Sequence, residues 1–330
     1  MLVPASTFSD SAAKLGNVLE VVAVFFAVLL LIFYVAGKAS GKLEKPIAIL
    51  VFLVPAVLLL LIGLIIPAIR TFYYSFYGAT SVKSVGFDNY KWAFTTPAIQ
   101  TVLKNTLLWI IVAPVLATAL GLTIALMVDR MKHQAIVKSL IFMPMVISFV
   151  GASIIWNFVY NYRDSSQPQI GLLSKVVITL GWKHPPNWIL SSPLNNFLLI
   201  VIMIWIQTGF AMVVLSAALK SVPDEIIEAA RVDGAHGFRL FSSVQIPMIR
   251  STLVVVLTTI MIATLKVFDI VRTMTGGNFK TSVVANEMYN QTFVQFNNGH
   301  GSALAVILFL GVTPLVAYNV IQLRKERATR

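Results

Sequence analysis

Cysteine is absent from this chain of 330 residues, and charged side chains make up only 12% of it. Without cysteine, the chain can form no disulfide, no cysteine-ligated zinc site and no thiol nucleophile. The four histidines are far apart and lack metal-ligand spacing: His133, His184, His236 and His300. A soluble domain carries about 25% charged residues. The scarcity of charge, together with 58% hydrophobic residues, indicates that lipid surrounds much of the chain.

The formal net charge is +12, a value that would also suit a nucleic-acid partner. A protein that binds nucleic acid gathers its basic residues on one accessible face. Here the basic residues lie mainly in short loops between apolar runs, which is the pattern of a membrane protein. We therefore predict the lipid bilayer as a partner and no binding of nucleic acid.

Seven apolar stretches are long enough to span a membrane, since a spanning helix needs about 20 predominantly apolar residues. They are residues 18–36, 46–69, 105–128, 139–160, 197–219, 251–271 and 302–321. The sequence therefore predicts an all-α polytopic membrane protein with about seven transmembrane helices. The first apolar stretch is longer than that of a signal peptide and has no basic leader, so we expect it to be retained as a helix.

The lysine and arginine residues indicate the orientation of these helices. One alternate set of loops holds 14 basic residues in about 60 positions, and the opposite set holds 10 in about 120. Loops rich in basic residues face the cytoplasm. We therefore expect the N-terminus outside and the C-terminus in the cytoplasm.

The cytoplasmic loop 220–250 has the pattern of two short helices joined by a turn. Ser221 can cap the first helix and Pro223 fits its first turn. The helical pattern continues to Val232. Gly234 then permits a turn, because glycine adopts positive φ at little cost.

The second helix of this loop is amphipathic, with Phe238, Phe241 and Val244 three residues apart. Pro247 is expected to end it. Such a hairpin can project from the membrane and contact a partner protein. It can also lie on the lipid headgroups, held there by its arginine side chains. The residues alone leave both arrangements open.

The same loop resembles the "EAA…G…I-x-L-P" signature of ABC importer permeases. The matching residues are Glu228, Ala229, Ala230, Gly234, Val244, Ile246 and Pro247. Val244 and Ile246 replace the isoleucine and leucine of that pattern, and both changes conserve apolarity. The resemblance implies that this segment docks on a separate cytoplasmic ATPase. The residues assigned to that contact are Glu228, Ala229, Ala230, Asp233, Gly234, Phe241 and Pro247.

The resemblance extends over about residues 46–325, and the string LKVFDIVRTMTGGN is most like the α-glucoside permeases of the maltose type. It implies a type I importer core of six helices. The remaining parts are an extra N-terminal helix with a cytoplasmic linker (1–45) and a basic cytoplasmic tail (326–330). A phosphate-binding loop is absent from the sequence, so another chain must hydrolyse ATP. The implied partners are a second homologous permease subunit, a cytoplasmic ATPase dimer, a periplasmic or extracellular sugar-binding protein and the sugar. No cofactor is predicted.

Lys266 and Asp269 are the charged residues within the apolar stretch 251–271. Three positions apart, they would share one face of a helix. A charge at membrane depth costs at least about 2.5 kcal/mol and usually faces a cavity or a partner. Three readings are open: an ion pair between the two, a lysine side chain that reaches the interface, or a polar lining of the transport path.

The resemblance favours the third reading, because maltose-type permeases contact sugar around the positions that match Phe268 and Asp269. An aromatic face for C–H groups and a polar side chain for hydroxyls would suit a sugar. Gln207 and Thr208 in stretch 197–219 are the expected companions on a facing helix. Such residues also serve as hydrogen-bonding contacts between helices.

Two other classes of function fit the sequence less well than an importer permease. A secondary transporter would use Asp269 and Lys266 to couple transport to an ion, but this class often has inverted repeats, and the chain has no such halves. A membrane-embedded enzyme would need a nucleophile with a base or a metal cluster, and the helices contain neither. We therefore predict a permease subunit of an inner-membrane importer for an α-glucoside or disaccharide, with no catalytic residues of its own.

Overall fold

The computed structural model of the protein describes four stretches of the chain: residues 5–38, 44–129, 131–164 and 166–328. Residues 39–43 of the predicted linker and residues 329–330 of the predicted tail lie outside this described part. The chain divides into two compact units, Met1–Arg70 and Thr71–Arg330. Each unit is described by itself.

The first unit consists of two long apolar helical runs. They are α1 (Ala5–Lys38) and the sequence of α2 (Glu44–Leu60), η2 (Leu61–Ile65) and the first part of α3 (Ile66–Tyr74), which continues into the second unit from Thr71. The rings of Phe33 and Phe52 join the runs edge to face, with centroids 5.9 Å apart. None of the described residues in their spanning windows is buried, as expected for helices that lie in lipid or against a partner. The expected division at residues 45 and 46 falls inside this unit and stays a prediction.

The second unit is built from helices. In chain order they are α4 (Asp88–Thr95), α5 (Pro97–Val128), α6 (Gln134–Phe142), η3 (Met143–Val146), α7 (Phe149–Val159), α8 (Leu172–Thr179), α9 (Leu194–Lys220), α10 (Asp224–Val232), α11 (Gly237–Leu240), η4 (Phe241–Gln245), α12 (Ile246–Leu265), α13 (Asp269–Met274), α14 (Val284–Tyr289), η5 (Asn290–Val294) and α15 (Asn298–Ala328).

Within the described residues, six helices are long and apolar enough to span a membrane, or seven if one bent pair counts as a single span. The prediction of about seven spans in an all-α protein is confirmed. Over 139–160 the span is broken: α6 with η3 meets α7 at an angle of 102°. Pro144 lies in η3 and is followed by extended backbone at Ile147 and Ser148. These residues account for the break, since proline removes a helical hydrogen bond and clashes with the preceding turn.

Helix α9 is the centre of the second unit, and 67% of its spanning window is buried. Two glycines allow the neighbouring helices to approach its backbone. A Cβ atom on Gly121 of α5 would lie 2.5 Å from the Cβ of Ala211, and one on Gly209 of α9 would lie 2.7 Å from the carbonyl oxygen of Ile141 in α6. Small residues at such crossings are typical of membrane helices, where close packing drives association. The largest fully buried side chains include Trp109, Leu199, Ile202, Met203, Met212 and Leu215.

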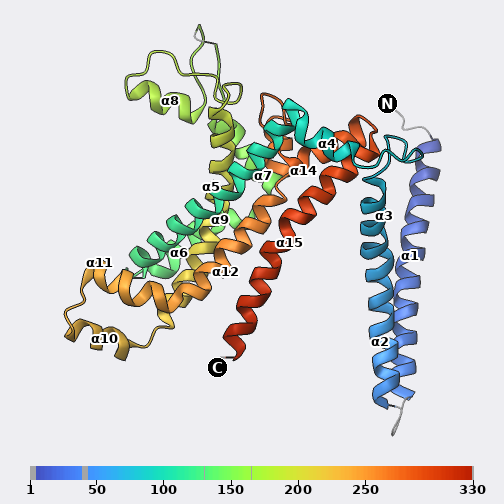
Figure 1. Cartoon of the computed structure of the whole chain (residues 1–330), viewed down its shortest axis with the longest axis horizontal. Coiled ribbons are helices and arrows are strands. Elements are labelled where there is room, and N and C mark those ends of the chain that lie inside the picture. Colours follow the sequence, from blue (N-terminus) through green and yellow to red (C-terminus); the bar gives the residue numbers. More distant parts are fainter. Residues whose placement is uncertain (1–4, 39–43, 130, 165, 329–330) are drawn as a thin grey trace. The chain divides into compact units, whose positions relative to one another are not determined.

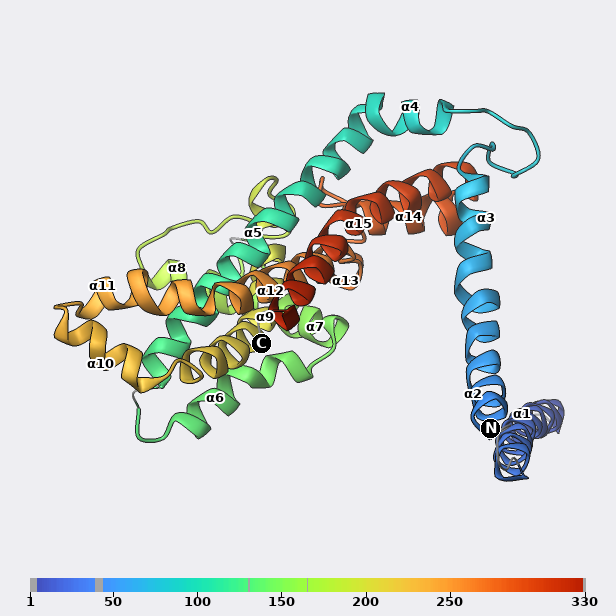
Figure 2. The same cartoon turned by 60° about the horizontal axis from the view of Figure 1, so that its bottom comes forward.

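The short helices of the second unit gather at the ends of its long ones (Figure 1, Figure 2). α10 and α11 lie together next to the C-terminal end of α9. We call this region, residues 126–129, 131–138 and 216–246, the α10 end. α4, α14 and the beginning of α15 lie together at the opposite end (Figure 1). The α10 end contains the predicted coupling loop.

Candidate functional site

The predicted hairpin of loop 220–250 is present as α10, a turn and α11. Gly234 has φ +83°, so the prediction that glycine makes the turn is confirmed. The predicted cap is wrong: Pro223 precedes the first residue of α10 and no side chain caps it. The hydroxyl of Ser221 instead donates to the carbonyl of Ala218 at 2.7 Å, because Ser221 lies at the end of α9, where free carbonyl groups need donors.

The prediction that Pro247 ends the second helix is also wrong. The residues Gly237–Leu265 form one continuous run, in which Pro247 lies in the first turn of α12. A π-helical turn, η4, comes immediately before it. Such a turn accommodates the hydrogen bond that proline cannot make. The predicted apolar face is present nearby, where the ring centroids of Phe238 and Phe241 lie 6.2 Å apart.

Helix α10 is held at its inner face and open at its outer face. Ile227 packs against a buried cluster that includes Leu219 and Val222. A cavity of about 640 Å³ separates α10 from α11, and its lining includes Leu126, Ile227, Arg231, His236, Phe238 and Phe241. Of the predicted coupling residues, five are exposed: Glu228, Ala229, Asp233, Gly234 and Pro247. Ala230 and Phe241 are half-buried. The hairpin therefore presents a surface that the rest of the second unit does not cover.

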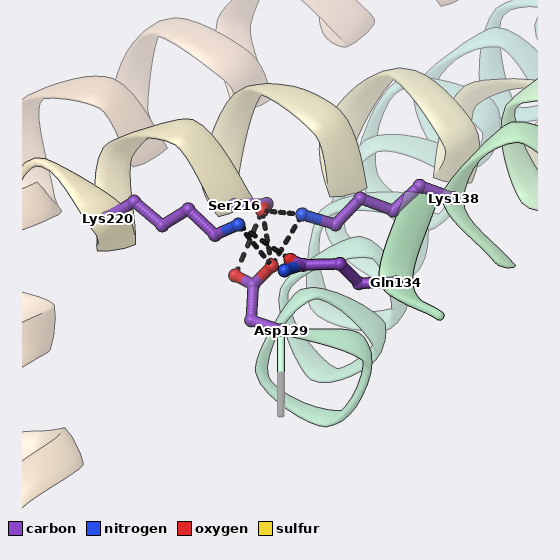
Figure 3. Close-up of polar contacts among 5 residues, drawn as sticks. All are labelled: Asp129, Gln134, Lys138, Ser216 and Lys220. Carbon is purple, nitrogen blue, oxygen red and sulfur yellow. Dashed lines mark hydrogen bonds and ion pairs between the residues drawn. The ribbon is translucent and has the colours of Figure 1, made fainter. Parts of the chain in front are cut away.

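A charge cluster of five side chains lies where the ends of α5, α6 and α9 meet (Figure 3). Asp129 follows the last residue of α5, and Lys138 of α6 donates to its carboxylate at 2.5 Å. The hydroxyl of Ser216 in α9 lies 2.8 and 2.9 Å from the two carboxylate oxygens and accepts from Lys138 at 2.5 Å. Lys220, the last residue of α9, lies 3.5 Å from Asp129 and donates to Gln134 at 2.6 Å. We call these five residues the Asp129 cluster. It connects the ends of three helices.

The carboxylate of Asp129 is charged and well partnered. Its side chain is only 16% exposed, and burial by itself raises the pKa of a carboxyl group. The hydrogen bonds from Lys138 and Ser216 and the charges of Lys138 and Lys220 outweigh burial and lower the pKa of Asp129 below its ordinary value. Charge-assisted hydrogen bonds of this kind are about twice as strong as neutral ones.

Sequence reasoning did not find this cluster. Lys138 and Lys220 are among the basic loop residues that predict the orientation, and the sequence alone assigns no role to Asp129. The available signal was an acidic residue directly after an apolar stretch and among basic neighbours. Its partner Ser216 is 87 positions away in the chain, so the contact requires knowledge of how α5 and α9 pack.

A second group of charged residues lies at a break in the predicted span 251–271. α12 ends at Leu265, Lys266 follows its last turn, and α13 begins at Asp269. The prediction that Lys266 and Asp269 share one helical face is therefore wrong. A basic residue after one helix and an acidic residue at the start of the next suit the two helix dipoles. Neither side chain forms an ion pair or a hydrogen bond with any residue that the structure describes.

A cavity of about 350 Å³ lies beside this break, and its lining includes Lys266, Phe268, Met288, Tyr289, Ala305 and Leu308. The rings of Phe268 and Tyr289 are tilted by 44° with centroids 5.1 Å apart. Arg272 lies 4.8 Å above the Tyr289 ring and donates to Asn290 at 2.9 Å. Two aromatic rings with polar neighbours can bind a ligand that has both C–H and hydroxyl groups.

The expected companions on α9 lie elsewhere. Thr208 is buried, and its hydroxyl donates to the carbonyl of Ile204 in its own helix at 2.7 Å. It lines a different cavity, of about 460 Å³, together with Trp156 and Trp205. Gln207 is half-buried. The structure therefore does not bring Gln207 and Thr208 into the cavity of Phe268.

A bundle of spanning helices with an exposed helical hairpin at one end and no phosphate-binding loop has the architecture of the membrane component of an ATP-driven importer. Residues 117–328 match the family described as the binding-protein-dependent transport system inner membrane component, and the chain belongs to this family. It is 48% identical over 279 residues, 84% of this chain and 100% of the relative, to the osmoprotective compounds uptake permease protein GgtC of Synechocystis sp..

Two further comparisons cover most of the chain. It is 43% identical over 295 residues, 89% of this chain and 88% of the relative, to the alpha-glucoside transport system permease protein AglF of Rhizobium meliloti. A crystal structure of a bacterial ABC transporter involved in the import of the acidic polysaccharide alginate contains a similar chain. The TM-score is 0.73 at 20% identity, over 86% of this chain and 97% of that one, which is a likeness of fold alone.

Membership of the family settles the class of function. The chain is a multi-pass inner-membrane permease that works with a binding protein and partner subunits, and the ATPase activity resides in a partner subunit. The alternative of a secondary transporter that couples transport to an ion through Asp269 and Lys266 is therefore wrong.

Proposed function

We propose that this permease transports an α-glucoside of about disaccharide size, and that the sugar passes the break between α12 and α13. The observation that carries the proposal is the cavity in which the rings of Phe268 and Tyr289 lie side by side. Aromatic faces bind the C–H side of a sugar, and Asp269 next to Phe268 has a free carboxylate for hydroxyl groups. The name of AglF, an alpha-glucoside permease, supports this class of substrate. The name of GgtC gives osmoprotective compounds as the second class to test.

The test is uptake of labelled trehalose, maltose and sucrose by cells that carry the complete importer. Phe268→Ala removes one ring of the pair, a loss of about 0.5–1.5 kcal/mol beyond buried area, so uptake at low sugar concentration should fall by about threefold or more. Phe309→Ala is the matched control, because Phe309 follows the lining residue Leu308 but is 66% exposed and outside the cavity lining. Equal uptake by wild type and Phe268→Ala would reject this path.

The α10 end is proposed to face the cytoplasm and to dock on an ATPase dimer, with a second homologous permease subunit beside this chain and a sugar-binding protein at the opposite end. The supporting observations are the exposed face of α10 and the density of basic residues in its loops. The N-terminus then lies outside and the C-terminus inside. A hairpin lying on lipid headgroups, the other arrangement, would leave no open face for a protein.

Single cysteines test this orientation, because the chain has none of its own. Val232 in α10 is 88% exposed and Val82 before α4 is 80% exposed. In intact cells a membrane-impermeant thiol reagent should label Val82→Cys and leave Val232→Cys unlabelled until the cells are opened. Reversed labelling would overturn the orientation and the ATPase contact together.

A further inference from the structure

The Asp129 cluster lies at the C-terminal end of α9, just before α10. We call residues 216–223 the root of α10. Ser216 and Lys220 are four residues apart and therefore on one face of α9, and Lys220 is the last residue of that helix. Helix α10 begins at Asp224. The carboxylate of Asp129 thus contacts the last turns of α9 through Ser216 and Lys220 (Figure 3). The hairpin begins directly after this end of α9.

Lys138, Ser216 and Asp129 are each hydrogen-bonded to the other two. The ammonium of Lys138 donates both to Asp129 and to the hydroxyl of Ser216, and that hydroxyl donates to the carboxylate. A hydroxyl has one donor and free acceptor sites, so Ser216 can serve both partners at once. Lys220 adds a bond to Gln134, the first residue of α6. The ends of α5, α6 and α9 are therefore held in one arrangement.

Packing does not require this cluster. The same end has an apolar core that already joins α5 to α9 and α12, with members Ala125, Met212, Ala218, Leu219, Val222 and Ile249. Replacing a buried ion pair by apolar residues is often neutral or stabilising. A fully satisfied polar network instead defines one arrangement among several of similar packing energy.

We propose that Asp129, with Lys138 and Ser216, is the positioning element that fixes the root of α10 to α5 and α6, so that a displacement of α10 moves the three helices together. Asp129 acts through α9 and touches neither ATP nor the transported sugar. This inference rests on the proposed docking of α10 on the ATPase. It adds the connection from the docking helix to the spans.

The experiment uses the complete importer with its ATPase and partner permease, reconstituted in liposomes. Nitroxide labels at Ala135→Cys in α6 and Val232→Cys in α10 report the distance between the two helices by double electron–electron resonance; both positions are exposed. Transport and ATP hydrolysis are measured on unlabelled importer. Asp129→Asn should broaden the distance distribution and lower the sugar transported per ATP by about fivefold or more. Asp164→Asn is the matched control, since Asp164 is a loop carboxylate that accepts hydrogen bonds from Ser166 of the same loop.

A double variant separates positioning from stability. Asp129→Leu with Lys138→Met leaves no buried charge without a partner, because the remaining Lys220 is 51% exposed and keeps its hydrogen bond to Gln134. The amount of assembled importer should therefore return to the wild-type level. The broad distance distribution and the low transport per ATP should persist. Recovery of both by the double variant would show a structural pair only and overturn the proposal. An assembled Asp129→Asn importer with unchanged distances and coupling would overturn it as well.

Ser216→Ala keeps the ion pair and removes the hydroxyl link, so it gives a result even if Asp129→Asn does not assemble. It should broaden the distance distribution, and a distribution identical to wild type would reject the proposal. The label distance needs neither sugar nor ATPase contact. If the proposed docking or substrate were wrong, wild-type coupling or uptake would fail while the effect of Asp129→Asn on the distance remained.

Discussion

Two groups of charged residues interrupt the apolar helices of the second unit, and they differ in their partners. In the Asp129 cluster one carboxylate receives donors from α6 and α9. At the break between α12 and α13, Lys266 and Asp269 have no ion pair or side-chain hydrogen bond with any described residue. The first group joins helices, whereas Lys266 of the second group lines a cavity of about 350 Å³.

This difference in partners distinguishes a polar network that joins helices from a site that can bind a ligand. A polar network whose groups are all satisfied holds its helices in one geometry and has little capacity left for a ligand. Charged groups without partners keep that capacity, and near a membrane they persist where they face water, a cavity or a substrate.

The largest effect is expected from Gly209→Val, which breaks the packing that brings α6 to α9. A Cβ atom at residue 209 would lie 2.7 Å from the carbonyl oxygen of Ile141 and 2.9 Å from the Cα of Phe142. Both are backbone atoms and cannot rotate away, so α6 must move, at a cost of about 1–3 kcal/mol or more. Size-exclusion chromatography in detergent should show loss of the assembled permease. Gly63→Val, with no neighbouring atom within 4 Å, should assemble normally.

The next effect is a loss of function in an assembled importer. Gly234→Leu forces a residue with a side chain into φ +83°, which costs about 1–2 kcal/mol and displaces α10. Glu228→Arg reverses an exposed charge on the same helix. Both variants should insert and assemble, but sugar uptake and the stimulation of ATPase by the loaded binding protein should be lost. Unchanged uptake by Gly234→Leu would contradict the docking of α10.

Much of the fold could be predicted because composition and local pattern determine it. The lengths of apolar runs give the spans, and Gly234 marks the hairpin turn. The sequence does not locate the break after Leu265, because a run of apolar residues contains no information on where helical hydrogen bonding stops. Lys266 and Asp269 carried a usable signal, since a basic residue followed by an acidic one matches the end of one helix and the start of the next.

The candidate site was less predictable because it depends on distant contacts. Asp129 and Ser216 meet only when Gly121 lets α5 approach α9. Phe268 and Tyr289 meet through the packing of helices that follow the break. Pro247 does not end its helix for a local reason, because a preceding π turn lets the helix continue through proline.

An intermediate effect is expected at Asp269, which has no partner among the described residues. Asp269→Asn keeps the size of the side chain and removes its charge, so uptake should weaken while assembly stays normal. If Asp269 served only as a partner of Lys266, the double variant Lys266→Met with Asp269→Leu would restore what either single change loses. Because the two side chains are not paired, we expect no rescue. Full recovery of uptake in the double variant would remove Asp269 from the sugar path.

The smallest effect is a pH dependence of stability that is specific to the Asp129 cluster. The pKa of Asp129 is lowered in the folded protein, so its contribution to the free energy of unfolding is present above the ordinary pKa of 3.8 and is lost as the pH falls through the lowered value. Between about pH 5 and 8 the carboxylate is therefore ionised in both the folded and the unfolded chain. The difference in melting temperature between wild type and Asp129→Asn, measured in detergent, should be constant over this range and should shrink only in stronger acid. A difference that shrinks between pH 8 and pH 5 would mean that another titrating group controls this end of the bundle, because an Asp129 held by Lys138 and Ser216 has no proton to gain there.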